Sequence, residues 1–165
     1  MVPVQARNDV NSEVRGFQKM SRSQMVAMFV ALGVLGGCAT APIPSKDAID
    51  VPSERVYSFK LPTTPESAKA IVIRDSGMLG GGCFLALWID GTLAGRFNPA
   101  EKAEFFISPG ERVLRVGRDP QGKALCALDG DNWTQRESVF KPQETKYFRL
   151  RIGREGKADV ERTDP

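Results

Sequence analysis

The sequence contains no histidine. Histidine is the commonest general base in enzymes, and its absence excludes Ser-His-Asp and Cys-His nucleophilic sites. A zinc site would have to use carboxylates and cysteines alone. Asp129 and Asp131 flank a glycine as in calcium-binding loops, but no glutamate follows at the EF-hand distance, so we interpret them as a turn. These absences predict that the protein is not an enzyme and that it holds no metal and no cofactor.

The sequence also lacks a hydrophobic run long enough to cross a membrane as a helix. The longest run, residues 25–35, has about eleven residues, whereas a membrane-spanning helix needs roughly twenty. It follows the basic residues Lys19 and Arg22, as the core of a signal peptide does. It leads into Leu35-Gly36-Gly37-Cys38, in which two glycines leave room for a processing peptidase and the thiol can accept a lipid.

This quartet resembles the lipobox of bacterial lipoproteins. The resemblance implies that residues 1–37 are a signal peptide and that Cys38 becomes a new N-terminus, with a diacylglyceryl group and usually a third chain, a palmitate. Two or three chains give a lasting membrane anchor, because one chain alone holds only marginally. Ala39 resembles the residue at this place in lipoproteins sent to the periplasmic face of the outer membrane rather than kept in the inner membrane. The alternative is a buried core segment that ends in a free cysteine.

The start of this leader has two interpretations. Residues 1–19 are polar and without periodicity, which is unusual ahead of the basic region of a signal peptide. A start at Met20 would give a leader of ordinary length, with residues 1–19 as an upstream extension that is not translated.

The charge balance of the remaining chain is nearly neutral. Residues 1–37 hold four basic and two acidic side chains, which leaves 19 basic and 18 acidic side chains in residues 38–165. Nucleic-acid binding requires a clear basic excess, because its affinity comes largely from counterion release. We therefore expect no nucleic-acid partner.

Residues 38–67 are rich in proline and show no sustained periodicity. A segment of this kind extends by up to about 3 Å per residue, so we interpret it as a linker that holds the following domain away from the membrane. Within it, residues 57–61 alternate between apolar and polar side chains, which predicts one short strand on the edge of the domain.

Residues 68–152 alternate densely between apolar and polar side chains, with turn residues about every eight to twelve positions. This spacing predicts an all-β fold, a small antiparallel Ig-like β-sandwich of about seven strands. Asp90-Gly91 favours a type I′ hairpin turn and Pro109-Gly110 a second tight turn. Residues 153–165 are either a final strand, at 158–162, or a charged tail. The other predicted strands are 69–74, 84–89, 92–97, 103–107, 112–117, 124–128, 134–140 and 145–152.

The order of these strands and turns resembles that of PEGA-motif domains and related bacterial lipoprotein domains. The residues that carry the resemblance are 88–95, 107–114 and 141–147. It implies a PEGA-like sandwich that serves in binding or spacing rather than catalysis. We therefore expect a structural or interaction module that contacts another envelope protein or a cell-wall polysaccharide. The alternative is a cell-wall polysaccharide-binding or hydrolysing enzyme, for which no pair of carboxylates stands out.

Two tryptophans and three arginines are the candidate surface for a ligand or partner. Trp88 lies on the strand face opposite its neighbouring leucines, and Trp133 lies in a loop. Open indoles would offer a platform for a sugar ring or a partner, whereas the simpler interpretation is that both fill the core. Arg149, Arg151 and Arg154 form either a basic stripe for lipid or polysaccharide phosphates or an ordinary solvated face.

The sequence has three cysteines, and lipid on Cys38 would leave two. A signal peptide delivers the chain to a compartment in which disulfides persist, so we predict a bridge between Cys83 and Cys126. The alternatives are two buried thiols or one reactive cysteine, although no Cys-x-x-Cys pair is present. The bridge requires Cα atoms about 4.4 to 6.8 Å apart.

Overall fold

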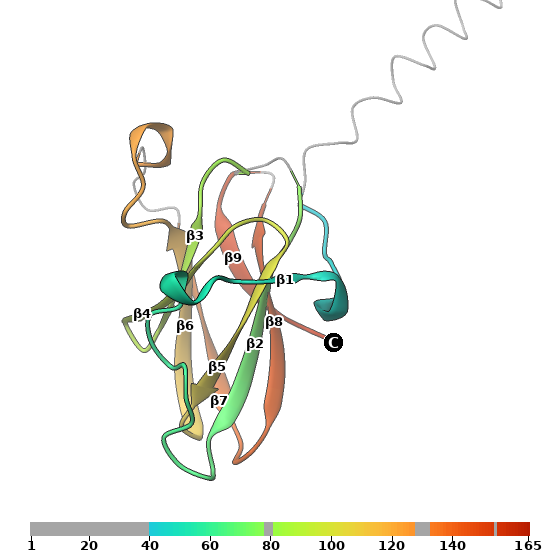
Figure 1. Cartoon of the computed structure of the whole chain (residues 1–165), viewed down its shortest axis with the longest axis vertical. Coiled ribbons are helices and arrows are strands. Elements are labelled where there is room, and N and C mark those ends of the chain that lie inside the picture. The colour runs from blue at the N-terminus through green and yellow to red at the C-terminus, as the bar shows by residue number, and fades with distance from the viewer. Residues whose placement is uncertain (1–39, 78–80, 128–132, 154) are drawn as a thin grey trace, which may run out of the picture. The chain divides into compact units, whose positions relative to one another are not determined.

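The computed structural model describes residues 40–77, 81–127, 133–153 and 155–165 (Figure 1). The predicted signal peptide and the lipobox cysteine, Cys38, lie outside these residues. The chain divides into two compact units, Met1–Gly37 and Cys38–Pro165, and only the second contains described residues. That unit is an all-β fold of two sheets, as predicted. None of the helices in the described ranges combines the length and the apolar character that a membrane crossing needs.

The first sheet has five strands in the order β1-β5-β2-β8-β9. Their bounds are β1 Ile49–Asp50, β2 Ala68–Arg74, β5 Glu101–Ile107, β8 Thr145–Ile152 and β9 Ala158–Thr163. β2 pairs antiparallel with β5 but parallel with β8, and β1 is parallel to β5. The sheet is therefore mixed, whereas the sequence pattern predicted an antiparallel one. β9 confirms the final strand and makes it a full member of the sheet.

The second sheet is antiparallel and has four strands in the order β4-β3-β6-β7. Their bounds are β3 Leu85–Ile89, β4 Thr92–Phe97, β6 Gly110–Arg118 and β7 Thr134–Phe140. Asp90 and Gly91 have φ angles of 48° and 78°, both positive as a type I′ turn requires, which confirms the first predicted hairpin. Gly110 has a φ angle of 113° and begins β6 directly after Pro109.

The inward-facing residues of both sheets form one hydrophobic core. Its largest fully buried apolar side chains are Phe97, Phe105, Phe140, Leu85, Leu87, Ile89, Ile107, Leu114 and Leu150. β2 is buried on both faces, which explains why its sequence is almost continuously apolar. Val72 faces the core, whereas Ile71 and Ile73 pack on the other side of the sheet against Ala48.

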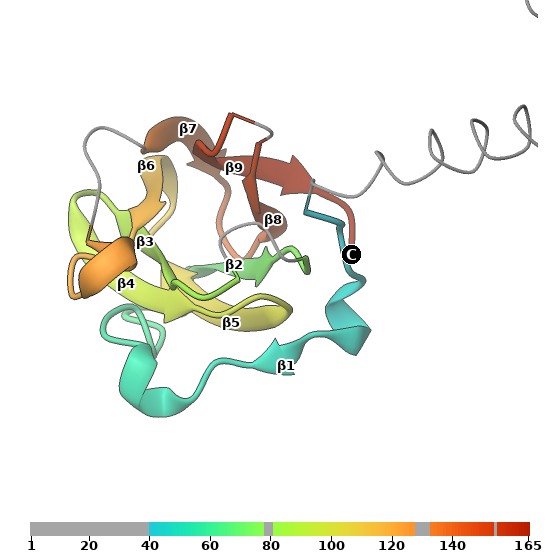
Figure 2. The same cartoon turned by 90° about the horizontal axis from the view of Figure 1, so that it is seen from above.

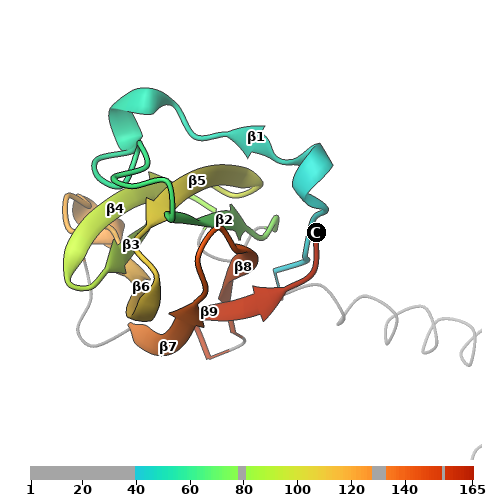
Figure 3. The same ribbon diagram turned by 90° about the horizontal axis from the view of Figure 1, so that it is seen from below.

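The chain around Ala48 belongs to the segment that was expected to be a linker, and the structure differs from that expectation. Residues 40–67 run along the outer side of β5 through two 3-10 helices, η3 (Ser45–Asp47) and η4 (Ser53–Arg55), as Figures 2 and 3 show from opposite sides. The amide of Val51 donates to the carbonyl oxygen of Lys102 at 2.8 Å, and the Val51 side chain is part of the core. Residues 40–67 are therefore packed on the domain as part of it and do not form a free linker.

The beginning of this segment is held by hydrogen bonds as well. The hydroxyl of Thr40 donates to the Asp75 carboxylate at 3.1 Å. The amide of Ala41 donates to the carbonyl oxygen of Ser76 at 2.8 Å, and the amide of Ser76 donates back at 2.9 Å. The described chain is therefore attached to the end of β2 from its first residue.

Residues 57–61 do not form the predicted strand. The amide of Tyr57 donates to the carbonyl oxygen of Ala94 in β4 at 2.8 Å, and the amide of Phe106 in β5 donates to the carbonyl oxygen of Phe59 at 2.9 Å. Phe59 itself has a φ angle of 61°, which is incompatible with an extended strand. The segment instead bridges the gap between the neighbouring edges of the two sheets.

An ion pair holds η4 in place. Both terminal nitrogens of Arg55 contact the Glu101 carboxylate at 2.6 Å, and the amide of Asn98 donates to the same carboxylate at 2.6 Å. Burial works to raise the pKa of Glu101, but the hydrogen bonds from Arg55 and Asn98 outweigh it and hold the pKa below its ordinary value. Glu101 is therefore a carboxylate that stabilises the fold in its ionised form.

The region predicted as a strand at 124–128 contains the 3-10 helix η5 (Ala124–Cys126). Cys126 in this helix forms the predicted disulfide with Cys83, and the two Cα atoms are 5.4 Å apart. The bridge joins the chain just before β3 to the connection between β6 and β7. The two cysteines are 43 positions apart in the sequence.

Candidate functional site

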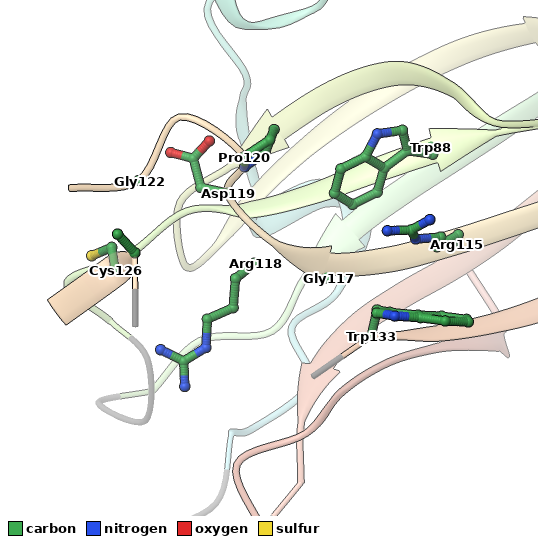
Figure 4. Close-up of a pocket in the computed structure, with 10 residues that line it drawn as sticks. Trp88, Arg115, Gly117, Arg118, Asp119, Pro120, Gly122, Cys126 and Trp133 are labelled. Atoms are coloured by element: carbon green, nitrogen blue, oxygen red, sulfur yellow. The ribbon is translucent and has the colours of Figure 1, made fainter. Parts of the chain in front are cut away.

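A pocket of about 320 Å³ lies on the outer face of the second sheet, next to the disulfide (Figure 4). Its walls come from β3, from β6 and the connection that follows it, and from the residue before β7. The lining residues are Trp88, Arg115, Gly117, Arg118, Asp119, Pro120, Gly122, Cys126, Ala127 and Trp133. Both tryptophans of the chain therefore line one hollow.

The pleat of β3 turns Trp88 away from the core. Leu85, Leu87 and Ile89 are buried on the inner side of this strand, and successive side chains of a strand point to opposite faces. The register with β4 shifts between Leu87 and Trp88, as at a β-bulge. The prediction that Trp88 shares the face opposite these residues is confirmed, and the simpler interpretation that both indoles fill the core is wrong.

Arg115 stacks against both indoles. It lies directly opposite Trp88 in the pairing of β3 with β6. Its guanidinium carbon is 4.9 Å from the centre of the Trp88 ring and 4.7 Å from the centre of the Trp133 ring. Figure 4 shows the guanidinium between the two indoles. Cation–π contacts of this kind hold flat side chains parallel, so Arg115 keeps the two rings apart and in place.

Gly117 provides the space for this arrangement. A Cβ atom at this position would be 3.0 Å from the Cβ of Trp133 and 3.6 Å from the nearest atom of Trp88. Any larger residue would push the Trp133 side chain outward. The pocket therefore depends on a glycine that sits two residues beyond Arg115 on the same face of β6.

The opposite wall is a short loop that is fixed by hydrogen bonds and by the disulfide. The carboxylate of Asp119 pairs with Arg96 of β4 and accepts a hydrogen bond from the amide of Gln121 at 2.9 Å. A Cβ at Gly122 would lie 2.5 Å from the carbonyl oxygen of Cys126, so only glycine fits where the loop meets η5. The loop is thus held from both ends.

The buried Arg74 supports the Cys83 end of the bridge. Its guanidinium donates to the carbonyl oxygens of Cys83 and Phe97 at 2.7 and 2.6 Å. Burial lowers the pKa of Arg74 to about 10, which still leaves the side chain charged near neutral pH. Arg74, at the end of β2, therefore ties the first sheet to the chain just before β3 and to the end of β4.

A second hollow, of about 460 Å³, lies on the other side of Trp133. It is lined by Trp133, Thr134, Gln135, Arg136 and Lys157. Thr134 and Arg136 reach across to β9, where they contact the Asp159 carboxylate at 3.0 Å each. Burial works to raise the pKa of Asp159, but the hydrogen bonds from Arg136 and Thr134 outweigh it and hold the pKa below its ordinary value. Trp133, which is 39% exposed, stands between the two hollows.

The two described arginines of the predicted basic stripe are paired rather than open. Arg149 forms an ion pair with the buried carboxylate of Asp75. Arg151 contacts Glu161 at 2.6 Å and Asp159 at 3.2 Å. Arg154, the third member, lies outside the described residues, as do Asp129 and Asp131. The structure therefore gives Arg149 and Arg151 structural partners and does not bring them to the pocket.

The described part of the chain contains no group of three or more cysteine or carboxylate residues placed to hold a metal ion. Asp119 is the one carboxylate among the described residues that line the first pocket. Among the described residues, the pocket therefore offers stacking surfaces and cationic hydrogen-bond donors, and its one carboxylate is already paired with Arg96. The arrangement is suited to binding.

The sequence identified the two tryptophans of this site but not Arg115, Gly117 or Asp119. Arg115 lies 27 positions from its partner Trp88, and only the β3–β6 pairing brings them together. The alternation within residues 112–117 already placed Arg115 on the polar face, but it did not show what lies opposite. The chain matches no protein-family model, and it has no significant sequence similarity to any curated protein.

Proposed function

We propose that this is a lipid-anchored protein of the bacterial cell envelope and that its β-sandwich is a binding module rather than an enzyme. The lipobox-like quartet ending at Cys38 supports the anchor, and Ala39 favours the periplasmic face of the outer membrane. A structural disulfide suits an oxidising compartment of this kind. The observation that carries the binding role is the Trp88–Arg115–Trp133 stack beside an open pocket.

Two features favour the pocket over the strand edges at β4 and β5 as the binding surface. An exposed edge would bind a partner by adding a strand to the sheet. The edge of β4 is instead covered by Tyr57, whose amide donates to Ala94, and the edge of the first sheet next to β5 carries β1. Hydrolysis of a polysaccharide is less well supported than binding, because the one described carboxylate in the pocket is paired.

The anchor is tested by Cys38→Ser. This variant should accumulate as an unprocessed precursor without lipid, whereas the parent protein should be recovered with the outer membrane. A variant that still acquired lipid and fractionated with the membrane would contradict the anchor. Recovery of the parent protein wholly in the inner membrane would contradict the outer-membrane location.

The binding role is tested by cross-linking in intact cells, followed by mass spectrometry of what is captured. Trp133→Ala should lose the specific captured species, because it removes the exposed indole without touching the core. Val139→Ala is a matched control, since Val139 is 60% exposed on β7 of the same sheet. Identical capture by the parent and by Trp133→Ala would contradict a role for the pocket.

A further inference from the structure

We propose that the two hollows on either side of Trp133 form one binding site for an acidic glycan, an oligosaccharide that carries carboxylate groups. This inference rests on the proposed binding function and names its ligand class.

Among the described residues that line the two hollows, four are basic (Arg115, Arg118, Arg136 and Lys157) and one, Asp119, is acidic. Arg115 has no hydrogen bond or ion pair with a carboxylate among the described residues, and its described partners are the two indoles. A guanidinium held by its faces directs its N–H groups outward in its own plane, where they can bind a carboxylate in a bidentate manner. The acid in the first hollow, Asp119, is only 7% exposed and already pairs with Arg96.

The second hollow repeats this pattern. Lys157 is exposed at its edge, and the Arg136 side chain keeps 59% of its surface exposed despite its contact with Asp159. The two hollows therefore place cationic groups on both sides of Trp133. A ligand that lies across the Trp133 indole and carries a negative group on each side of it would match the cationic groups of both hollows.

The platform between these charges fits a sugar ring. One face of the Trp133 indole is covered by Arg115, and 39% of the residue surface is still exposed. The apolar C–H face of a pyranose ring can pack on such an indole while its hydroxyl and carboxylate groups reach the rim. Since Trp133 lines both hollows, they suit a chain of rings better than a single small molecule.

An acidic peptide would carry the same charge but fits the backbone less well. The floor of the pocket is β6, which is paired with β3 on one side and with β7 on the other. The backbone groups of β6 are therefore used within the sheet and are not available to an extended peptide, so that of the two strands at the hollows only β7, at the end of the sheet, could pair with one. This observation favours the glycan.

The protein carries its own reporter for the test, because its two tryptophans are both at the site. Titration of the full-length protein with trigalacturonic acid should give a saturable change in tryptophan fluorescence. The methyl-esterified trisaccharide, which lacks the charge, should bind at least about tenfold more weakly, since it loses a charge-assisted hydrogen bond to Arg115. Binding of the acid should also weaken as salt is raised.

Variants separate this proposal from its alternatives. Arg115→Gln should weaken binding of the acid about tenfold or more, while the exposed Arg162→Gln on β9 should leave it unchanged. Trp133→Ala should abolish it, with Trp88 as the remaining fluorophore. The thermal melt of each variant shows whether it is folded. A folded Arg115→Gln that bound as tightly as the parent would overturn the proposal.

Three other results would overturn the glycan class. Equal binding of the acid and its methyl ester would mean that charge is not recognised. Tighter binding of a glutamate-rich peptide than of the glycan would identify a peptide site. Absence of any trigalacturonate response, together with capture in cells that still depends on Trp133, would refute the acidic glycan while the proposed binding function stood.

Discussion

Removal of the Cys83–Cys126 bridge should be the most costly change to the stability of the domain that leaves its core intact. The bridge closes a loop of 43 residues. Loss of this constraint on the unfolded chain costs about 4 kcal/mol in the chain-entropy description. Whole domains are stabilised by only about 5 to 15 kcal/mol, so the loss is a large share of the total. For a domain of this size it corresponds to a fall in melting temperature of roughly 12 to 20 °C.

The assay is thermal unfolding followed by far-ultraviolet circular dichroism, with and without reductant. The double variant Cys83→Ser, Cys126→Ser should melt at a temperature well below that of the oxidised parent protein and should not respond to reductant. The reduced parent should approach the variant. Because Cys126 lines the pocket, tryptophan fluorescence should change before the far-ultraviolet signal does. A melting temperature within about 2 °C of the oxidised parent would refute the reasoning.

Three further predictions concern the site and the fold. Because the pKa of Glu101 is lowered, its stabilising effect is complete above about pH 4.5 and is lost as the pH falls through the lowered pKa. The denaturant midpoint of the protein should therefore drop over this pH range. Glu101→Gln should be less stable than the parent at neutral pH and should show a smaller drop at low pH. Gly117→Val should push Trp133 outward, lower the stability by about 1 to 3 kcal/mol and shift the fluorescence maximum to longer wavelength, while an unchanged spectrum would contradict the packing at Gly117. A chain that begins at residue 65 should have a clearly lower denaturant midpoint than one that begins at residue 38, because it loses the cover over Ile71; equal midpoints would contradict the role of residues 40–64.

The parts of the fold that depend on neighbouring residues could be predicted from the sequence. The Asp90-Gly91 hairpin is specified by two residues that tolerate positive φ, and the alternation on either side of it fixes which side chains face inward. The disulfide followed from the number of cysteines and the expected compartment. None of these inferences required knowledge of which distant strands are neighbours.

The parts that failed depend on long-range pairing. The continuously apolar β2 indicated a strand, but the pattern did not show that it pairs parallel with β8 or that its second face is covered. The cover comes from residues 40–51, whose prolines and lack of periodicity are typical of a linker. This segment is ordered by contacts with β5 and β2 rather than by its own secondary structure. Likewise, 124–128 has a strand-like composition, but the disulfide and the tight loop at Gly122 hold its beginning as a single helical turn.

The attachment of Thr40 to Asp75 limits how far the domain could move from the proposed anchor at Cys38. If Cys38 carries lipid, only Ala39 lies between the lipidated residue and the first hydrogen-bonded side chain, so that the chain takes two residue steps from Cys38 to Thr40. Two residues extend by at most about 7 Å. The sandwich would then remain at the bilayer surface and search for its ligand by lateral diffusion within that plane. Its accessible ligands would be those that come within a few ångströms of the lipid headgroups. Insertion of residues between Cys38 and Thr40 would let the domain reach ligands farther from the membrane.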